Sequence, residues 1–235
     1  MLAIYKKELR SYFTGVIGYV FLVLYLALAA LLLAYTTFFS MTANVATFFT
    51  LMIYVSAIAL PLLTMKSFSE EKKGKTEQLL LTAPVSITSI VLGKFLAAYT
   101  LFAGCMIVNT LYCLILAAYA NLKYGILFGS LVAVLLVGLV FIAIGLFVSS
   151  LTENQLAAAI GTIGIIVLFL GIGLMSMILP SDYAVRYVFN FLSIFTRFQA
   201  FISGWFDFTA VLYYVSLAVI FLYLTVRVYD RRRYN

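Results

Sequence analysis

Histidine is absent from this 235-residue chain, and charged residues make up only 10% of it. Without histidine the sequence offers neither an HExxH metal pair nor a Ser–His nucleophile arrangement. A soluble domain usually carries about 25% charged and about 45–50% apolar residues, whereas 66% of this chain is hydrophobic. These shortages predict one integral membrane domain over residues 1–235, without catalytic or metal-binding residues and without a separate soluble core.

Cysteine is also scarce. Cys105 and Cys113 lie eight positions apart in one apolar run, roughly 12 Å along a helix, which is too far for a disulfide. The formal net charge of +7 is expected to reflect membrane topology rather than a nucleic-acid partner. The first apolar run is too long for a signal-peptide core, so we expect it to be retained as a span.

Uncharged apolar runs long enough to cross a bilayer, about 20 residues, recur along the chain. Six are found, at residues 16–39, 45–65, 95–119, 124–148, 156–179 and 208–226. None contains Asp, Glu, Lys or Arg, which disfavours a carrier that couples to ions through intramembrane acids or bases. The predicted fold class is therefore an all-α membrane protein with six transmembrane helices.

Residues 2–13 precede the first span and predict an amphipathic elbow helix lying in the headgroup plane. On a helical wheel an apolar arc is formed by Leu2, Tyr5, Leu9, Tyr12 and Phe13. Off this arc lie Lys6, Lys7 and Arg10. The alternative is a disordered basic leader, which would not need aligned aromatic residues.

Residues 66–94 form a charge-dense insert between the second and third runs. They favour a solvated docking helix whose water-facing residues are Glu70, Glu71, Lys72, Lys73, Lys75, Glu77 and Gln78, with an apolar edge at Leu79, Leu80 and Leu81. Pro84 is expected to end this helix, and Ser86 to cap a second one that leads into the third span. The alternative is a simple solvated loop.

Gly74-Lys75-Thr76 within the insert resembles the end of a phosphate-binding P-loop. That motif needs a glycine five positions earlier, where this chain has Ser69, and a strand in front of it rather than a membrane helix. We therefore expect the chain itself to bind neither nucleotide nor another cofactor.

Residues 181–207 are rich in aromatic residues but carry Asp182, Arg186, Arg197 and Asp207. A lipid-facing span containing two arginines would cost several kcal/mol. The segment therefore predicts two short re-entrant helices at the outer interface, with an aromatic belt. Its candidate residues are Tyr183, Arg186, Tyr187, Phe191, Arg197, Phe201 and Trp205.

Six spans place both termini on one side of the membrane. With that side cytoplasmic, twelve basic residues lie inside, namely Lys6, Lys7, Arg10, Lys66, Lys72, Lys73, Lys75, Lys94, Arg227, Arg231, Arg232 and Arg233. Three lie outside, namely Lys123, Arg186 and Arg197. This asymmetry predicts cytoplasmic termini in a cell membrane, inner or plasma, and a cytoplasmic insert.

Small and polar residues inside the spans suggest packing sites. Gly125, Gly129 and Ala133 form a stripe in the fourth span, and Ala157 with Gly161 forms another in the fifth. Packing within the chain is preferred, with packing between chains as the alternative. The amide of Asn109 is expected either to join helices or to contact substrate. The turn Glu153-Asn154-Gln155 is either a polar turn or a partner contact.

Two long phrases carry a family resemblance. YKKELRSYF at residues 5–13 precedes two spans, and FSEEKKGKTEQLLLTAPVSITSIVLGKF at residues 68–95 follows them. Together with the six-span layout they resemble the permease subunits of ABC-2 type, or type V, ABC exporters. The phrases look most like the small gliding-motility-associated (GldF-like) and nitrous-oxide-reductase maturation permeases. Thr14-Gly15-Val16 departs from a common Ser-Pro step, which leaves the angle of the first span open.

The resemblance implies a transport subunit rather than an enzyme. It implies a homo- or heterodimer of permeases, a cytoplasmic ABC ATPase subunit that holds ATP and Mg, and possible extracytoplasmic accessory subunits. It places ATPase docking at the insert, the elbow at residues 5–13, re-entrant helices at residues 181–207, and the transport path along spans one, two and five. The alternatives are a membrane scaffold for a larger machine, without transport, and an ion-coupled secondary carrier.

Overall fold

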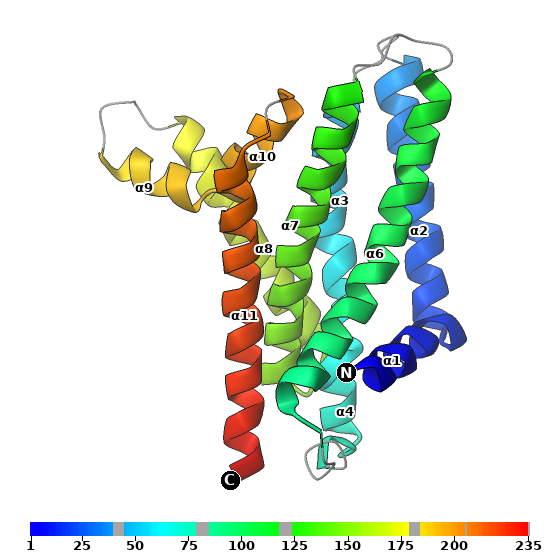
Figure 1. Cartoon of the computed structure of the whole chain (residues 1–235), viewed down its shortest axis with the longest axis vertical. Helices are drawn as coiled ribbons and strands as arrows, with labels where there is room; N and C mark the ends of the chain where they lie inside the picture. Colours follow the sequence, from blue (N-terminus) through cyan, green and yellow to red (C-terminus); the bar gives the residue numbers. More distant parts are fainter. Residues whose placement is uncertain (40–44, 79–84, 118–123, 179–183, 205, 235) are drawn as a thin grey trace.

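The computed structural model describes residues 1–39, 45–78, 85–117, 124–178, 184–204 and 206–234. Throughout these residues the chain is helical and contains no strand (Figure 1). The elements are α1 (Leu2–Thr14), α2 (Val16–Ala34), the π-helix η1 (Tyr35–Phe39), α3 (Val45–Thr64), α4 (Lys66–Lys73), α6 (Ile87–Ala117), α7 (Tyr124–Leu151), α8 (Gln155–Ile178), α9 (Ala184–Leu192), α10 (Ile194–Ile202) and α11 (Phe208–Tyr234). The predicted all-α fold is confirmed for this part of the chain.

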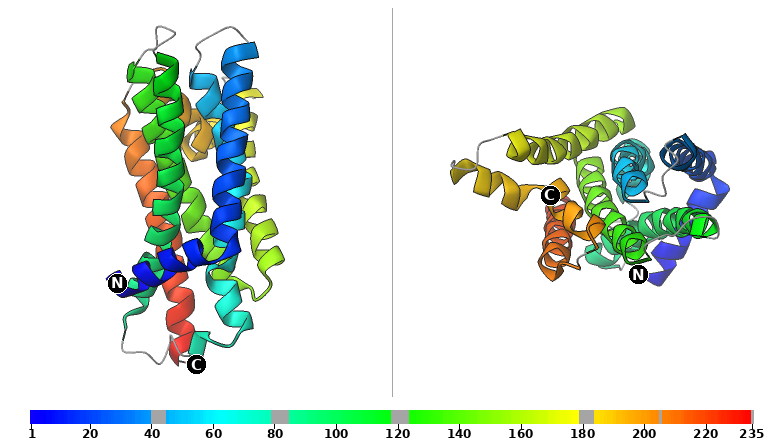
Figure 2. Two further views of the ribbon diagram at one scale, coloured as in Figure 1. Left: turned by 90° about the vertical axis from the view of Figure 1, so that its right-hand side faces the viewer. Right: turned by 90° about the horizontal axis from the view of Figure 1, so that it is seen from above.

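Among the described residues, six helices are long and apolar enough to cross a membrane: α2, α3, α6, α7, α8 and α11. They run up and down in one elongated bundle, and both chain termini lie toward the same end (Figure 1). Helix α1 lies across that end of the bundle, and α2 rises from it (Figure 2). The prediction of six helices long and apolar enough to span a membrane is thus confirmed for the described residues. An even number of such helices also places the two termini toward one end.

Several long helices extend beyond the apolar runs. Helix α6 begins at Ile87, so Lys94 lies in its second turn rather than before it. Helix α11 continues through the arginine-rich tail to Tyr234. The helix expected after Ser86 is therefore present, and it is continuous with the third span. Lys94 does not interrupt it, and the arginines prolong α11, because Lys and Arg are good helix formers.

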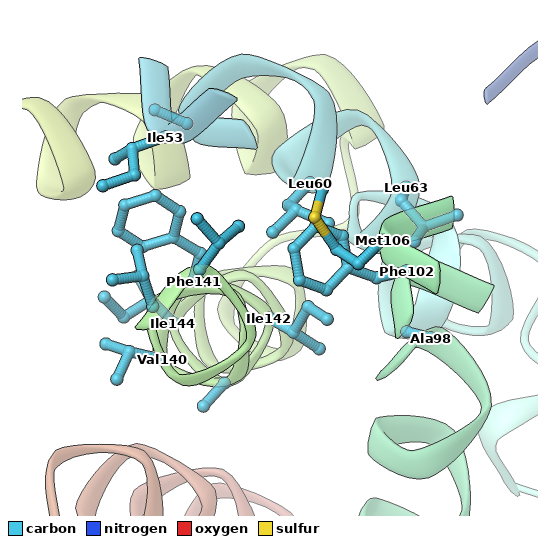
Figure 3. Packing of buried hydrophobic residues seen from close by; sticks show 14 of the residues in the cluster. Ile53, Leu60, Leu63, Ala98, Phe102, Met106, Val140, Phe141, Ile142 and Ile144 are labelled. Carbon is cyan, nitrogen blue, oxygen red and sulfur yellow. The ribbon is translucent and has the colours of Figure 1, made fainter. Parts of the chain in front are cut away.

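Helix α7 is the central element of the bundle. It packs against α3, α6, α8, α10 and α11, and the side chains of residues 140–144 are fully buried. Figure 3 shows Phe141 and Ile142 of α7 among side chains of α3 and α6. Because lipid is as apolar as these side chains, close van der Waals contact rather than water exclusion holds such helices together.

Two glycines let neighbouring helices approach α7 closely. A Cβ at Gly138 would lie 2.0 Å from Cε1 of Phe102 on α6, and one at Gly145 would lie 2.1 Å from Oγ1 of Thr64 on α3. Any larger side chain at either position would force the helices apart. These two contacts fix the spacing of α3, α6 and α7.

The predicted small-residue stripes pack only in part. In α7, Gly129 approaches the Phe201 carbonyl and Ala133 is fully buried, whereas Gly125 faces open space. In α8, Gly161 faces Val148 of α7, but Ala157 is exposed. The tightest helix contacts of α7 therefore lie outside the predicted stripe, at Gly138 and Gly145.

Polar side chains inside the bundle behave differently from one another. The Tyr25 and Ser56 hydroxyls share a buried 2.8 Å hydrogen bond that joins α2 to α3. In contrast, both amide atoms of Asn109 are buried without a hydrogen-bond partner. Asn109 therefore does not join helices through hydrogen bonds in this arrangement.

Helices α9 and α10 lie toward the opposite end from the termini (Figure 1). Each has nine residues, or roughly 13 Å of length, less than half of a bilayer core of about 30 Å. Ser193 separates them and caps α10 by accepting a hydrogen bond from the Thr196 N–H at 3.0 Å. Helix α11 holds the junction, since the Tyr213 and Tyr214 hydroxyls donate to the carbonyls of Leu192 and Ile194, both at 2.7 Å.

Candidate functional site

The predicted docking segment begins at the junction of α3 and α4. Helix α4 follows α3 directly, and no side chain of its own caps its N-terminus. Ser149 of α7 supplies the missing partner, because its hydroxyl accepts from the N–H groups of Phe68 and Ser69, both at 3.1 Å, and donates to the Met65 carbonyl at 3.0 Å. The free N–H groups of a helix start are thereby satisfied by the central helix of the bundle. The direction in which α4 leaves the bundle is thus fixed by α7.

Lys94 of α6 is the most deeply buried charge near this junction, with 2% of the residue exposed. Its ammonium donates to the Ser67 carbonyl at 2.7 Å, to Glu71 at 2.8 Å and to Glu8 at 3.1 Å. The carboxylate side chains are 16% and 13% exposed. A buried ammonium has three donors, and here all three have acceptors. This Lys94 cluster ties the elbow helix, α4 and α6 together.

The Glu71 carboxyl responds to two opposing influences. Burial, the larger, raises its pKa, and the neighbouring Lys94 ammonium acts to lower it; the net shift of the pKa is upward. Burial therefore penalises the charged form of Glu71 more than its partners compensate. A neutral residue of the same shape should be tolerated better at Glu71 than at Lys94, whose loss would leave two carboxylates facing each other.

A stack of aromatic and cationic side chains continues from Lys94 to the C-terminal helix. The Lys94 ammonium lies 5.0 Å from the ring centroid of Phe68, and that ring lies 4.8 Å from the ring of Tyr229 on α11. The Arg232 guanidinium lies 5.5 Å from the Tyr229 ring and forms a 3.1 Å ion pair with Glu77. Helix α11 therefore holds the docking segment from the side opposite to the elbow.

The predicted water-facing residues of the docking segment divide into two groups. Exposed positions are Glu70, Lys73, Lys75 and Gln78. Three others have partners within the chain: Glu71 binds Lys94, Glu77 binds Arg232, and Lys72 donates to the Leu151 carbonyl at 3.3 Å and lies 3.9 Å from Glu153. For these three the expected water-facing placement is wrong, because Glu71 and Lys72 hold α4 against α6 and α7, and Glu77 holds the residues after α4 against α11. Leu79, Leu80 and Leu81 lie outside the described residues.

The segment that resembles a P-loop is a helix C-terminus. Gly74 ends α4. The Thr76 N–H donates to the Glu71 carbonyl at 3.0 Å, and the Lys75 N–H donates to the Lys72 carbonyl at 3.1 Å. Lys75 has a φ of 54°, the left-handed conformation that this type of helix end requires and that glycine adopts most easily. Sequence alone would assign that conformation to Gly74.

The predicted elbow residues of α1 differ in how far they are buried. On α1, Tyr5, Leu9 and Tyr12 are half-buried, whereas Leu2 and Phe13 are exposed, as are Lys6, Lys7 and Arg10. Burial, and then the charge of Glu8, raises the pKa of Tyr12. The contact with α6 is close, since a Cβ at Gly93 would lie 3.0 Å from Ile4. One side of the predicted apolar arc therefore packs on protein.

At the other end of the bundle, the Arg197 guanidinium is stacked between two aromatic rings. It lies 5.2 Å from the centroid of Phe191 and 4.5 Å from that of Tyr213. Phe201, on α10 itself, is fully buried. Among the other predicted residues of this segment, Arg186 and Tyr187 belong to α9, and Tyr183 and Trp205 lie outside the described residues.

The turn between α7 and α8 contacts α4 from within the chain, through Lys72 and Glu153. Asn154 shapes the turn itself, since its side-chain oxygen accepts from the Leu156 N–H at 3.0 Å. The interpretation of residues 153–155 as a polar turn therefore holds. Within the described part of the chain, no group of three or more His, Cys, Asp or Glu residues is placed to bind a metal ion.

Sequence reasoning missed the partners that organise this site, namely Glu8, Ser149 and Tyr229. Glu8 is the single acidic residue ahead of the first span, which was a usable signal for a buried basic partner. Ser149 and Tyr229 gave no signal, because a serine and a tyrosine near span ends are common. Their roles depend on contacts between residues about 80 and 160 positions apart.

Comparison with protein-family models gives a match to one described as "ABC-2 family transporter protein", over residues 2–233. The match covers nearly the whole chain, from the elbow helix to the arginine-rich end of α11. No match is found among the curated proteins.

Proposed function

Since the chain belongs to the ABC-2 transporter family, we propose that it is the permease subunit of an ATP-driven exporter, coupled to a separate cytoplasmic ATPase chain. Permeases of this family normally work with an ABC ATPase in a membrane. In our proposal the ATPase holds ATP and Mg, while this chain performs no chemistry. The likeness to gliding-motility and nitrous-oxide-reductase maturation permeases, in which coupling drives export or mechanical work, belongs to the same proposal.

The observation that carries the proposal is the way residues 66–78 are held. Lys94, Ser149 and Arg232 bind this segment from α6, α7 and α11. A loop that is free to move would absorb a force applied to it, whereas a segment bound to three spanning helices passes that force on. An ATPase that docks here would therefore act on the packed spans directly.

The exposed residues Glu70, Lys73, Lys75 and Gln78 offer the docking face, with Leu79 and Leu80 as its proposed apolar edge. Energetically, the ATPase must bind this face with different affinity in its two nucleotide states, or no conformational change would follow. A mixed-charge helix surface suits such a role, because rearranged ion pairs on the partner change the binding energy.

Helix α11 is the proposed route from this end of the bundle to the other. It bears Tyr229 and Arg232 at the docking segment, and Tyr213 and Tyr214 at the junction of α9 and α10. Its 27 residues span roughly 40 Å as one helix. Movement of α4 would therefore be transmitted as a rigid shift to α9 and α10, which we propose to be re-entrant helices on the outer side. Dimerisation, with an accessory outer subunit in some assemblies, completes the proposal.

The test is co-purification of the full chain from its native membrane in mild detergent, followed by ATPase measurement on the complex. Lys73→Glu should release the ATPase chain or lower its activity several-fold, because it reverses an exposed charge on the docking face. Lys6→Glu, a reversal of an exposed charge on the elbow, is the matched control and should retain the partner. Lack of any ATPase chain in the purified complex, or equal effects of both variants, would contradict the proposal.

A further inference from the structure

A cavity of about 570 Å³ lies between the elbow helix, the start of α2 and α4. Its floor includes the Lys94 cluster, and its wall includes residues 15–18 at the first turn of α2. Its rim carries charges of both signs, from Lys7, Lys66 and Glu70. None of the contacts described so far gives this cavity a role.

The ion pairs of the cavity fall into tight and loose sets. Lys94 binds Glu71 and Glu8 at 2.8 and 3.1 Å, which leaves one negative charge on the floor. Lys7, 3.9 Å from both carboxylates, balances that charge. At the rim, the Lys66–Glu70 and Lys7–Glu8 distances are both 3.9 Å. Such long, partly exposed pairs contribute little, and their charged groups can turn to a ligand.

Two further features of the wall suit a phosphate group. Gly15 precedes α2 without a side-chain cap, so the N–H groups of the first turn lack a side-chain acceptor, and a helix of 19 residues directs a positive dipole end there. Ser67 lines the cavity, is 8% exposed, and its hydroxyl has no hydrogen-bond partner. A buried hydroxyl in this state is a rare exception in proteins. The oxygen itself is enclosed, so the Ser67 side chain would rotate toward the cavity to donate to a ligand oxygen.

The surroundings indicate an amphiphile rather than a free anion. The cavity lies at the level of α1, which runs across the end of the bundle where the apolar helices begin (Figure 2). Immediately above the cavity, α2 presents exposed apolar residues, with Val16 77%, Tyr19 54% and Val20 47% exposed. Acyl chains can lie along this face while the headgroup enters the cavity.

From these observations we propose that the cavity binds the headgroup of a phospholipid that carries a primary ammonium, of the phosphatidylethanolamine type. The phosphodiester lies at the first turn of α2 with Lys7, Lys66 and the Ser67 hydroxyl as donors, and the ammonium lies at the Glu70 carboxylate. The bound lipid would hold the elbow helix against α4. Glu70 also belongs to the proposed docking face, but lipid binding can be measured without an ATPase, because it needs only this chain and a lipid.

The experiment is native mass spectrometry of the full chain in detergent, titrated separately with phosphatidylethanolamine, phosphatidylcholine and phosphatidylglycerol. One phosphatidylethanolamine should bind preferentially. Lys66→Gln should weaken its binding about tenfold, equivalent to about 1.4 kcal/mol, and Lys66→Arg should restore most of it. Lys73→Gln, also on α4 but away from the cavity, is the matched control and should bind lipid as the unaltered chain does.

Ser67→Ala provides a second variant that does not endanger folding, because it removes a hydroxyl with no partner. It should leave thermal stability in lipid-free detergent unchanged and weaken lipid binding about threefold. Inorganic phosphate and glycerophosphoethanolamine are the water-soluble competitors. Displacement of the lipid by millimolar phosphate would overturn the proposal in favour of a simple anion site. Equal binding of the three lipids, or equal losses in Lys66→Gln and Lys73→Gln, would overturn it as well.

Discussion

Replacing Lys94 by glutamine removes the cation that Glu8 and Glu71 share. Removing one partner of a buried ion pair typically costs about 3–5 kcal/mol, and the two carboxylates are 13% and 16% exposed, so some of their charge can be hydrated. We therefore expect the lower end of that range, about 3 kcal/mol. For a chain of this size such a loss corresponds to a fall in Tm of about 6–12 °C.

The companion variant Glu71→Gln should cost only about 1 kcal/mol, because the Lys94 ammonium keeps its bonds to Glu8 and the Ser67 carbonyl. It also removes a carboxylate whose charged form is disfavoured by burial. In the double variant Lys94→Gln/Glu71→Gln only the Glu8 carboxylate remains, so the repulsion between two carboxylates is absent. Its loss of stability should therefore fall below the sum of the single losses by about 1 kcal/mol or more.

The assay can use the two cysteines of α6. Cys105 and Cys113 are both buried and neither forms a disulfide, so a thiol-reactive fluorophore reports their exposure during thermal unfolding of the full chain in detergent. A Lys94→Gln protein that melts with the unaltered chain would refute the reasoning. So would a Glu71→Gln protein that loses as much stability as Lys94→Gln, because the charge imbalance would then not be the cause.

Three further predictions use the same melting assay. Ser149→Ala should cost about 2–3 kcal/mol, because two buried N–H groups of α4 lose their acceptor, whereas Ser150→Ala, which removes a bond only within α7, should cost far less. Lys75→Gly should stabilise the chain by about 1 kcal/mol, because glycine adopts the left-handed conformation without strain. Gly138→Val should cost about 3 kcal/mol or more through its clash with α6, whereas Gly104→Val, which faces open space, should have little effect.

Each of these predictions has a contrary outcome. Equal melting of the two serine variants would mean that Ser149 does not support α4. A loss of stability in Lys75→Gly would contradict the helix-end geometry. Similar melting of the two valine variants would show that α6 and α7 are not in close contact at Gly138.

The agreement between sequence and structure is greatest for the spanning helices. Their number follows from runs such as residues 16–39 and 124–148, since a bilayer admits only segments that satisfy their own backbone hydrogen bonds. The two arginines of residues 181–207 likewise excluded a seventh span, and α9 and α10 are too short to be one. These conclusions need only composition and length.

The sequence located the charged insert but not its internal contacts. Composition marked residues 66–94 as the charge-dense segment, yet it could not separate Glu70, which is exposed, from Glu71, which is half-buried against Lys94. The two are neighbours in sequence, and a helix directs them about 100° apart. Only the positions of α1 and α6 determine which of the two lies inside.

The sequence by itself therefore determined a six-span membrane protein, its charged segment after the second span and its two short helices before the last. Those features depend on local hydrophobicity, which each stretch of the sequence specifies independently of the rest of the chain. The tertiary structure alone decided that Lys94 joins three helices, that Ser149 fixes the start of α4, and that α11 contacts both ends of the bundle. Such contacts join residues far apart in the chain, and their partners are chosen by helix packing, which hydrophobicity does not encode.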